Sequence, residues 1–215
     1  MNVLAVGSHW DDIEIGCSLT LKRLQEQGHG LYGVVMCQAF YQMEGHQGPS
    51  EEEARKNGET SFKRFGVQYV ETRKAENGRL AYNKDTMQEL EEVANSLKID
   101  TVFTHWYGDI NTDHKATWEI ARTAFRNIRN LFMFQSNSYS DFVNSFRPNY
   151  FFGFNASEYQ FKKDLASIYA KEWEYRRERW EREIFDREKY WGYLCGYDYA
   201  EGFQIGKLVH NSFIE

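Results

Sequence analysis

The stretch VLAVGSHWDDIEIGC, residues 3–17, joins an apolar run to two adjacent aspartates and then to a helical pattern. Residues 2–7 have the length and composition of a buried strand. From Asp12 onward the apolar positions recur at helical spacing, and Gly28 can close the helix. Residues 30–38, GLYGVVMCQ, are nearly continuous in apolar residues, which predicts a second strand that is buried on both faces. The first quarter of the chain therefore predicts a strand, a helix and a strand.

The same alternation continues along the chain. The sequence predicts helices over residues 50–66, 84–98 and 113–130 and strands over residues 67–71, 100–105 and 131–135. Ser50 is the predicted cap of the first of these helices, with Glu53 three residues later. Residues 156–193 predict a long, charged helical region whose charges form a solvated face. We expect an α/β, Rossmann-like fold with a mainly parallel sheet and helices on both faces.

Composition limits both the architecture and the partners. A chain of 215 residues that is 41% hydrophobic suits one compact domain over residues 1–215, and no linker or repeat divides it. A net charge of -6 argues against a nucleic-acid or anionic membrane surface and favours a small-molecule substrate. Cys17, Cys37 and Cys195 form no CxxC pair, and we interpret them as reduced core thiols. Without a leader or a long apolar run, the chain is expected to be cytoplasmic with no membrane span.

Histidine and aspartate side chains follow two of the predicted strands, in SHWDD and in THWYGDINTDH, residues 104–114. Ligands of such folds bind beyond the carboxyl ends of the strands. His9 and Asp12 can point to one side of a strand-to-helix turn, and His114 at a helix start can complete a site of two histidines and one carboxylate. This donor set suits zinc or another divalent first-row metal and leaves a fourth position for water. Asp11 then remains as a carboxylate that can take protons.

Each of these residues also has a structural interpretation. A histidine and an aspartate at a strand end more often form a capping or hydrogen-bonded feature than a metal site, although two such loops together favour the metal. Asp12 could instead be the N-cap of the first helix. His105 is as well suited to a hydrogen-bonded wall of the site as to metal ligation.

Two motifs resemble those of the PIG-L/LmbE-like deacetylases. VGSHWDDIEIGCSLTL, residues 6–21, resembles their opening signature AHPDDxE, and DINTDHKATWEIARTAF, residues 109–125, resembles their second signature, HPDH followed by a helix. Residues 146–169 and 196–203 are similar to later, less specific segments of the family. The resemblance implies a zinc-dependent hydrolase that removes an N-acyl group, most often acetyl, from an amino sugar or related compound.

Carried over by position, the resemblance makes His9, Asp12 and His114 the metal ligands and Asp11 the general base. Asn111 stands in place of the first histidine of the second signature, where it can donate a hydrogen bond to the oxyanion but cannot deliver a proton, so that Asp11 would make both proton transfers.

Two further positions and two further functions stay open. Trp10 replaces the signature proline, as part of a substrate wall or as a packed ring, and Arg55 lies near a family arginine. The same fold could cleave a non-sugar amide or a carbamoyl group, or the chain could be a non-catalytic metal- or sugar-binding derivative. A nucleotide-dependent enzyme is disfavoured because no GxGxxG or GxxxxGK motif follows a strand. Whether the chain forms a homo-oligomer is also left open.

Overall fold

The computed structural model of the chain describes residues 1–38, 42–43, 46–137, 144–170 and 177–209. Apart from two short strands at residues 42–43 and 46–47, strands and helices alternate through the first two thirds of it, as predicted. The elements in chain order are β1 (Asn2–Gly7), α1 (Asp12–Glu26), β2 (Gly30–Val35), β3 (Gln42–Met43), β4 (His46–Gln47), α2 (Glu51–Arg64), β5 (Gln68–Tyr69), α3 (Lys84–Ser96), β6 (Thr101–His105), α4 (Thr112–Ala124), β7 (Asn130–Phe134), β8 (Tyr150–Phe154), α5 (Ala156–Ala166), the short 3-10 helix η1 (Ser167–Tyr169), α7 (Arg177–Cys195) and β9 (Tyr199–Lys207).

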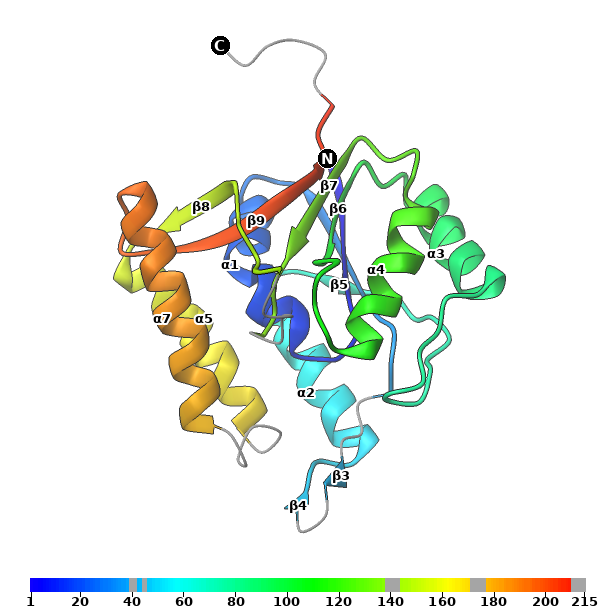
Figure 1. The fold of residues 1–215 in the computed structure, drawn as a ribbon, viewed down its shortest axis with the longest axis horizontal. Helices are drawn as coiled ribbons and strands as arrows, with labels where there is room; N and C mark the ends of the chain where they lie inside the picture. Colours follow the sequence, from blue (N-terminus) through cyan, green and yellow to red (C-terminus); the bar gives the residue numbers. More distant parts are fainter. Residues whose placement is uncertain (39–41, 44–45, 138–143, 171–176, 210–215) are drawn as a thin grey trace.

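The main sheet has seven strands in the order β5-β2-β1-β6-β7-β9-β8 (Figure 1). The five strands from β5 to β7 are parallel, which confirms the predicted mainly parallel sheet. The last two strands of the sheet, β9 and β8, were not predicted, and β9 runs antiparallel to both β7 and β8. They extend the sheet beyond β7 and bring the final third of the chain onto the same domain.

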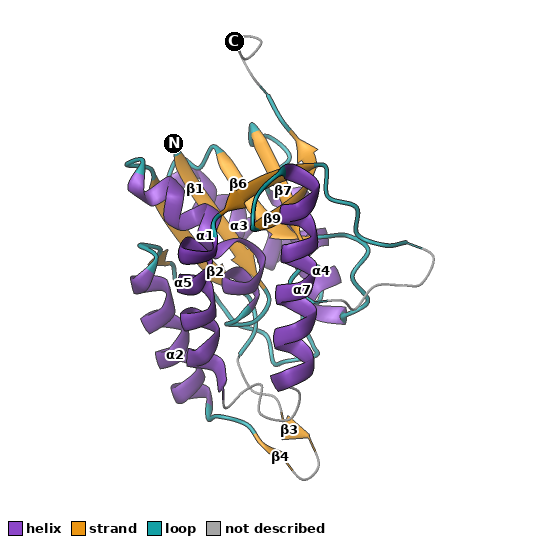
Figure 2. Cartoon of the chain, turned by 90° about the vertical axis from the view of Figure 1, so that its left-hand side faces the viewer, coloured by secondary structure: helices purple, strands orange, loops and turns teal. Residues whose placement is uncertain are grey.

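Helices cover both faces of the sheet (Figures 1 and 2). Val3 and Ala5 of β1 face a core that also includes side chains of α1, α2, α5 and α7. Leu4 and Val6, which point to the opposite face, pack in a second core with α3 and α4. The alternation of buried side chains along β1 explains why the strand is continuously apolar in sequence.

The local signals for helix ends are mostly accurate. Ser50 and Glu53 form the predicted capping box of α2. Gly28 follows α1 with φ +83°, a conformation that glycine adopts at low cost. The helix predicted over residues 113–130 ends at Ala124, because residue 130 already begins β7.

The charged region over residues 156–193 differs from its prediction. It forms α5, η1 and α7, with residues 171–176 outside the described part of the chain. Lys162 of α5 is buried and pairs with Glu188 of α7 at 2.8 Å and with Glu201 of β9 at 2.7 Å. The interpretation of this region as only a solvated face is therefore wrong, because part of its charge forms a buried network.

This network supports an irregular turn of α1. Cys17 has non-helical backbone angles, so the regular helical hydrogen bonds are interrupted there. The Glu201 carboxylate accepts hydrogen bonds from the backbone N–H groups of Leu19 and Thr20, and Lys162 donates to the carbonyl of Ile15. The charged side chains thus replace bonds that the helix itself lacks.

The described residues contain no helix that is both long and apolar enough to cross a membrane. All three cysteines are free thiols. Cys17 and Cys37 are buried as expected, whereas Cys195 at the end of α7 is partly exposed and does not belong to the core.

Candidate metal and active site

The two loops singled out in the sequence meet at the carboxyl ends of β1 and β6, which are neighbours in the sheet. After β1 the chain makes a tight turn in which the Asp12 carboxylate accepts hydrogen bonds from the backbone N–H groups of Ser8, at 3.1 Å, and His9, at 2.7 Å. Asp11, rather than Asp12, occupies the N-cap of α1. The alternative in which Asp12 caps the helix is therefore wrong, because its side chain bonds back to the turn.

Three donor groups converge at this turn. The Nδ1 of His9 lies 3.3 Å from the Nε2 of His114. The Asp12 carboxylate lies 3.3 Å from each of these nitrogens. Tetrahedral ligands that bind zinc at about 2.0–2.1 Å are separated from each other by about 3.3–3.4 Å. The donor set and its spacing fit a divalent metal ion.

The outer nitrogen of each histidine has its own acceptor. His114 Nδ1 lies 2.7 Å from the carboxylate of Asp109. His9 Nε2 lies 2.7 Å from the side-chain oxygen of Asn77 and 3.2 Å from the carboxylate of Asp113. These acceptors can accept hydrogen bonds from the outer nitrogens, so that the inner nitrogens can offer their lone pairs to an ion that displaces their own protons, as in most histidine metal sites.

The sequence identified only some of the residues that accept hydrogen bonds from the outer histidine nitrogens. Asp109 and Asp113 lie in the second predicted loop, but their spacing assigned them no role. Asn77 comes from the segment between β5 and α3, which had no metal-site signal. That segment is fixed to the site because Asp113 also accepts hydrogen bonds from the backbone N–H groups of Gly78 and Leu80.

His105 forms a wall of the site. Its ring is fully buried and stacks on that of His114 with 3.9 Å between centroids. Its Nε2 lies 3.1 Å from the Asp12 carboxylate. Burial and the neighbouring His114 lower the pKa of His105. The backbone N–H of Ser8 donates to its Nε2 at 3.0 Å, which fixes the ring beside Asp12. His105 makes this wall contact and also belongs to a possible donor group with Asp109 and His114, so the choice between its two predicted roles stays open.

The electrostatics of the site favour a cation. Burial alone would lower the pKa of His114, but the charge of Asp12 and the hydrogen bond to Asp109 outweigh burial and raise that pKa to about 9. Burial also opposes protonation of His9, yet hydrogen bonds with Asp113 and Asp12 raise its pKa. Carboxylates that attract protons to two facing imidazoles also attract a divalent ion to the point between them.

Asp11 and Asn111 occupy the N-caps of the two helices that begin at the site. The half-buried Asp11 makes no side-chain capping hydrogen bond to α1. The side-chain oxygen of Asn111 accepts hydrogen bonds from the backbone N–H groups of Asp113 and His114 and so caps α4. Because its oxygen is used in the cap, the Asn111 amide group keeps its N–H donors for other partners. The catalytic roles of Asp11 and Asn111 stay predictions.

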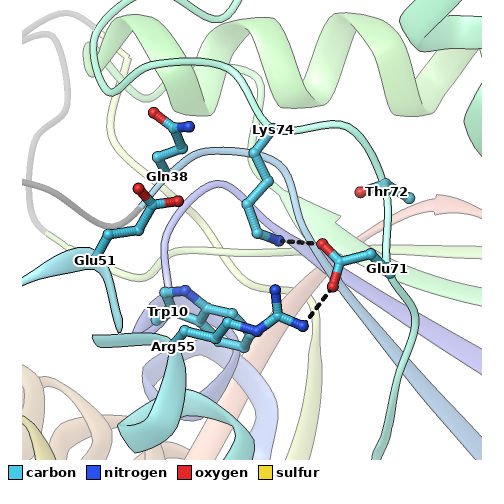
Figure 3. A pocket seen from close by; sticks show the side chains of 7 residues that line it. All are labelled: Trp10, Gln38, Glu51, Arg55, Glu71, Thr72 and Lys74. Atoms are coloured by element: carbon cyan, nitrogen blue, oxygen red, sulfur yellow. Dashed lines mark hydrogen bonds and ion pairs between the residues drawn. The ribbon is translucent and has the colours of Figure 1, made fainter. Parts of the chain in front are cut away.

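A polar pocket of about 220 Å³ lies beside the turn. Figure 3 shows Lys74 and Arg55 directed at Glu71 on one side, with Gln38 on the other and the Trp10 ring below. Arg55 bonds to Glu71 at 2.6 Å.

Trp10 is only 3% exposed, and its ring packs on those of Phe62 and Tyr69 with centroids 5.7 and 5.0 Å apart. It also contributes to the wall of the pocket. Trp10 is therefore a packed ring that also lines a pocket, and its role as a substrate wall stays a prediction.

Residues 4–125, more than half of the chain, match the protein family described as PIG-L, GlcNAc-PI de-N-acetylase. The chain belongs to this family. The matched segment extends from β1 to the end of α4 and contains both site loops, which confirms the resemblance that the two motifs indicated. None of the curated proteins matches the chain.

Solved structures share the PIG-L fold of this chain over nearly its whole length. The 4-carboxy-2-hydroxymuconate hydratase GalB from Pseudomonas putida has a TM-score of 0.81 and 17% identity, covering 100% of this chain and 99% of its own. The conserved protein TT1542 from Thermus thermophilus has a TM-score of 0.79 and 20% identity, with 99% and 98% covered. The N,N'-diacetylchitobiose deacetylase from Pyrococcus horikoshii has a TM-score of 0.79 and 19% identity, with 95% and 83% covered. At these identities the likeness concerns the fold.

Proposed function

We propose that this PIG-L family member is a metal-dependent amide hydrolase, with zinc as its metal, that removes an N-acetyl or other N-acyl group from an amino sugar or a related small molecule. The observation that carries the proposal is the convergence of His9, Asp12 and His114. The two facing imidazole nitrogens lie 3.3 Å apart, and each lies 3.3 Å from a different oxygen of the Asp12 carboxylate. Family membership supports deacylation, and the similarity to a chitobiose deacetylase supports a sugar substrate.

His9 Nδ1, His114 Nε2 and the Asp12 carboxylate would hold the metal ion. When bound there, a divalent ion supplies Lewis-acid polarisation of the acyl carbonyl and activation of a water molecule. Asp109 and Asp113 keep the protons on the outer histidine nitrogens, so that the inner ones stay available for the ion.

Asp11 would move the protons of the reaction. Its carboxylate takes a proton from the attacking water as the new C–O bond forms, and it returns that proton to the nitrogen as the C–N bond breaks. The side-chain N–H of Asn111 donates a hydrogen bond to the carbonyl oxygen as that oxygen gains charge. The products are a carboxylic acid and a free amine.

The pocket beside the turn would receive the substrate. Its charged and amide side chains can hydrogen-bond to hydroxyl groups, and the Trp10 ring offers an apolar wall, a combination that suits a sugar ring. We further propose that residues 1–215 act as one domain, because β9 and β8 continue the same sheet that carries the site. The free thiols fit a reducing cytoplasmic location.

The decisive experiment incubates the zinc-loaded protein with N-acetylglucosamine, N,N'-diacetylchitobiose and a carbamoylated analogue. We expect acetate and free amine in equal amounts, loss of activity after chelation, and recovery when zinc is added back. Ammonia in place of acetate would indicate carbamoyl cleavage. Tight metal binding without any product from these compounds would support a binding derivative instead of the enzyme.

A further inference from the structure

Cys37 places a sulfur atom beside His9, at the turn that follows β1. It follows β2, and its backbone N–H donates to the carbonyl of Ser8 at 2.9 Å, so that the β1–β2 pairing holds it beside the turn. The side chain is fully buried, and its sulfur lies within 4.8 Å of a ring nitrogen of His9. Cys37 also belongs to the apolar core that includes Leu4 and Val34, and its polar neighbours on the side of the turn are His9 and Asp113.

These neighbours complete a set of metal donors. A ring nitrogen of His9, the Sγ of Cys37 and a carboxylate oxygen of Asp113 all lie within 4.8 Å of one another. The His9 nitrogen that faces Asp113 is Nε2, at 3.2 Å, and the side-chain oxygen of Asn77 lies 2.7 Å from the same nitrogen. Nitrogen, sulfur and oxygen donors together suit zinc and the softer cadmium ion.

We propose that His9 Nε2, Cys37 and Asp113 form a second, inhibitory position for a thiophilic divalent metal ion. It shares only His9 with the first position. Asp113 is already held there, since backbone N–H groups of Gly78 and Leu80 bond to its two oxygens. A fixed carboxylate loses little conformational freedom when an ion binds, which favours a site that needs no rearrangement of the chain.

The two positions compete because they use opposite nitrogens of one imidazole. A neutral imidazole carries one proton and one free lone pair, so a proton on Nε2 leaves Nδ1 available to the first position. An ion at Nε2 moves that proton to Nδ1, while the thiol proton of Cys37 passes to solvent. Occupation of the second position therefore removes His9 from the first position and weakens its hold on the ion.

The test titrates the protein, loaded with one equivalent of zinc, with cadmium chloride. Three signals are followed together: the ultraviolet thiolate-to-cadmium absorption, zinc release to a coloured chelating indicator, and acetate production. The variant is Cys37→Ser, and the matched control is Cys195→Ser, which removes a different free thiol. Cys37→Ala serves as a second variant, and thermal unfolding checks that each protein is folded.

In the wild type and in Cys195→Ser we expect the absorption band to appear in step with zinc release and loss of activity. In both Cys37 variants the band should be absent, and zinc release should need on the order of 10- to 100-fold more cadmium. A band that persists without Cys37, or no band in the wild type, overturns the second position. A band without zinc release overturns the competition for His9.

The inference rests on the proposed function only where it calls the second position inhibitory. If the chain showed no hydrolase activity, the proposed function would fail, whereas the absorption band and zinc release would still decide whether Cys37 and His9 bind a second ion.

Discussion

Glu14 allows a quantitative test of how burial of a carboxyl group changes the pH dependence of the protein's stability. It lies in the first turn of α1, is 3% exposed, and accepts a hydrogen bond from the hydroxyl of Tyr169. Its second oxygen, Oε2, has no hydrogen-bonding partner among the described residues. Burial raises the pKa of Glu14 from 4.5 to about 8, because the charged form would lose its hydration without full compensation.

The sign of the pH dependence follows from proton binding. Between pH 4.5 and about 8 the unfolded chain has lost the Glu14 proton while the folded protein keeps it. The folded state then binds more protons, so the free energy of unfolding falls as the pH rises through this range. Each pKa unit corresponds to about 1.36 kcal/mol, which gives a loss of about 5 kcal/mol across the whole range.

Glu14→Gln removes this linkage and keeps an oxygen acceptor for Tyr169. We expect the stability of the variant relative to the wild type to increase with pH, by up to about 5 kcal/mol between pH 4.5 and 8. Urea unfolding followed by tryptophan fluorescence, repeated at several pH values, measures the difference. The control is Glu52→Gln on the exposed surface of α2, where the difference should stay constant. A constant difference for Glu14→Gln as well would refute the reasoning.

Three predictions concern the site. Asp11→Asn should retain its metal but lower kcat by roughly 10²- to 10⁴-fold, because an amide cannot take the proton. Asp12→Asn should bind metal more weakly and regain part of its activity with added zinc. Metal analysis and rate measurements on both variants test this, and the reverse pattern would mean that the two aspartates have exchanged roles. Asp109→Asn, which weakens the hydrogen bond to a ligand histidine, should reduce metal affinity by about 10- to 100-fold in a competitive chelator titration, and an unchanged affinity would argue against this support. Gly58→Ala should lower the free energy of unfolding by about 1–3 kcal/mol, because the new Cβ would lie 1.9 Å from the Trp10 ring; urea unfolding checks this, and an unchanged stability would mean that the ring moves freely.

The sequence was sufficient to predict that His9, Asp12 and His114 come together, because they lie at strand ends. Parallel strands place their carboxyl ends along one edge, so residues after β1 and β6 were expected to meet without knowledge of the side-chain geometry. Asn77 and Cys37 could not be found in this way. Each comes from a different segment and contributes a single side chain, and no spacing within its segment distinguishes it from a structural residue.

The final third of the chain shows a different limit of sequence patterns. Charged residues at helical spacing usually face water, and this rule missed Lys162 and Glu188, which are buried against each other. Their partner Glu201 lies on β9, an antiparallel strand that the sequence did not predict. Burial of the pair depends on contacts between α5, α7 and β9. Such tertiary contacts produce no periodic pattern of residues in the sequence of any one helix or strand.

The contrast between Asp11 and Asp12 shows how one turn gives two neighbouring carboxylates different chemistry. Asp12 points into the protein, where the backbone N–H groups of Ser8 and His9 donate to it and His105 lies 3.1 Å away. Although burial opposes its charge, the adjacent histidines hold the pKa of Asp12 well below its usual value, so this carboxylate stays ionised and can serve as a ligand. Asp11 occupies the N-cap, is only half-buried and makes no capping hydrogen bond. The start of α1 thus assigns the proposed metal-binding and proton-transfer roles by direction alone, since adjacent side chains at a helix start cannot face the same way.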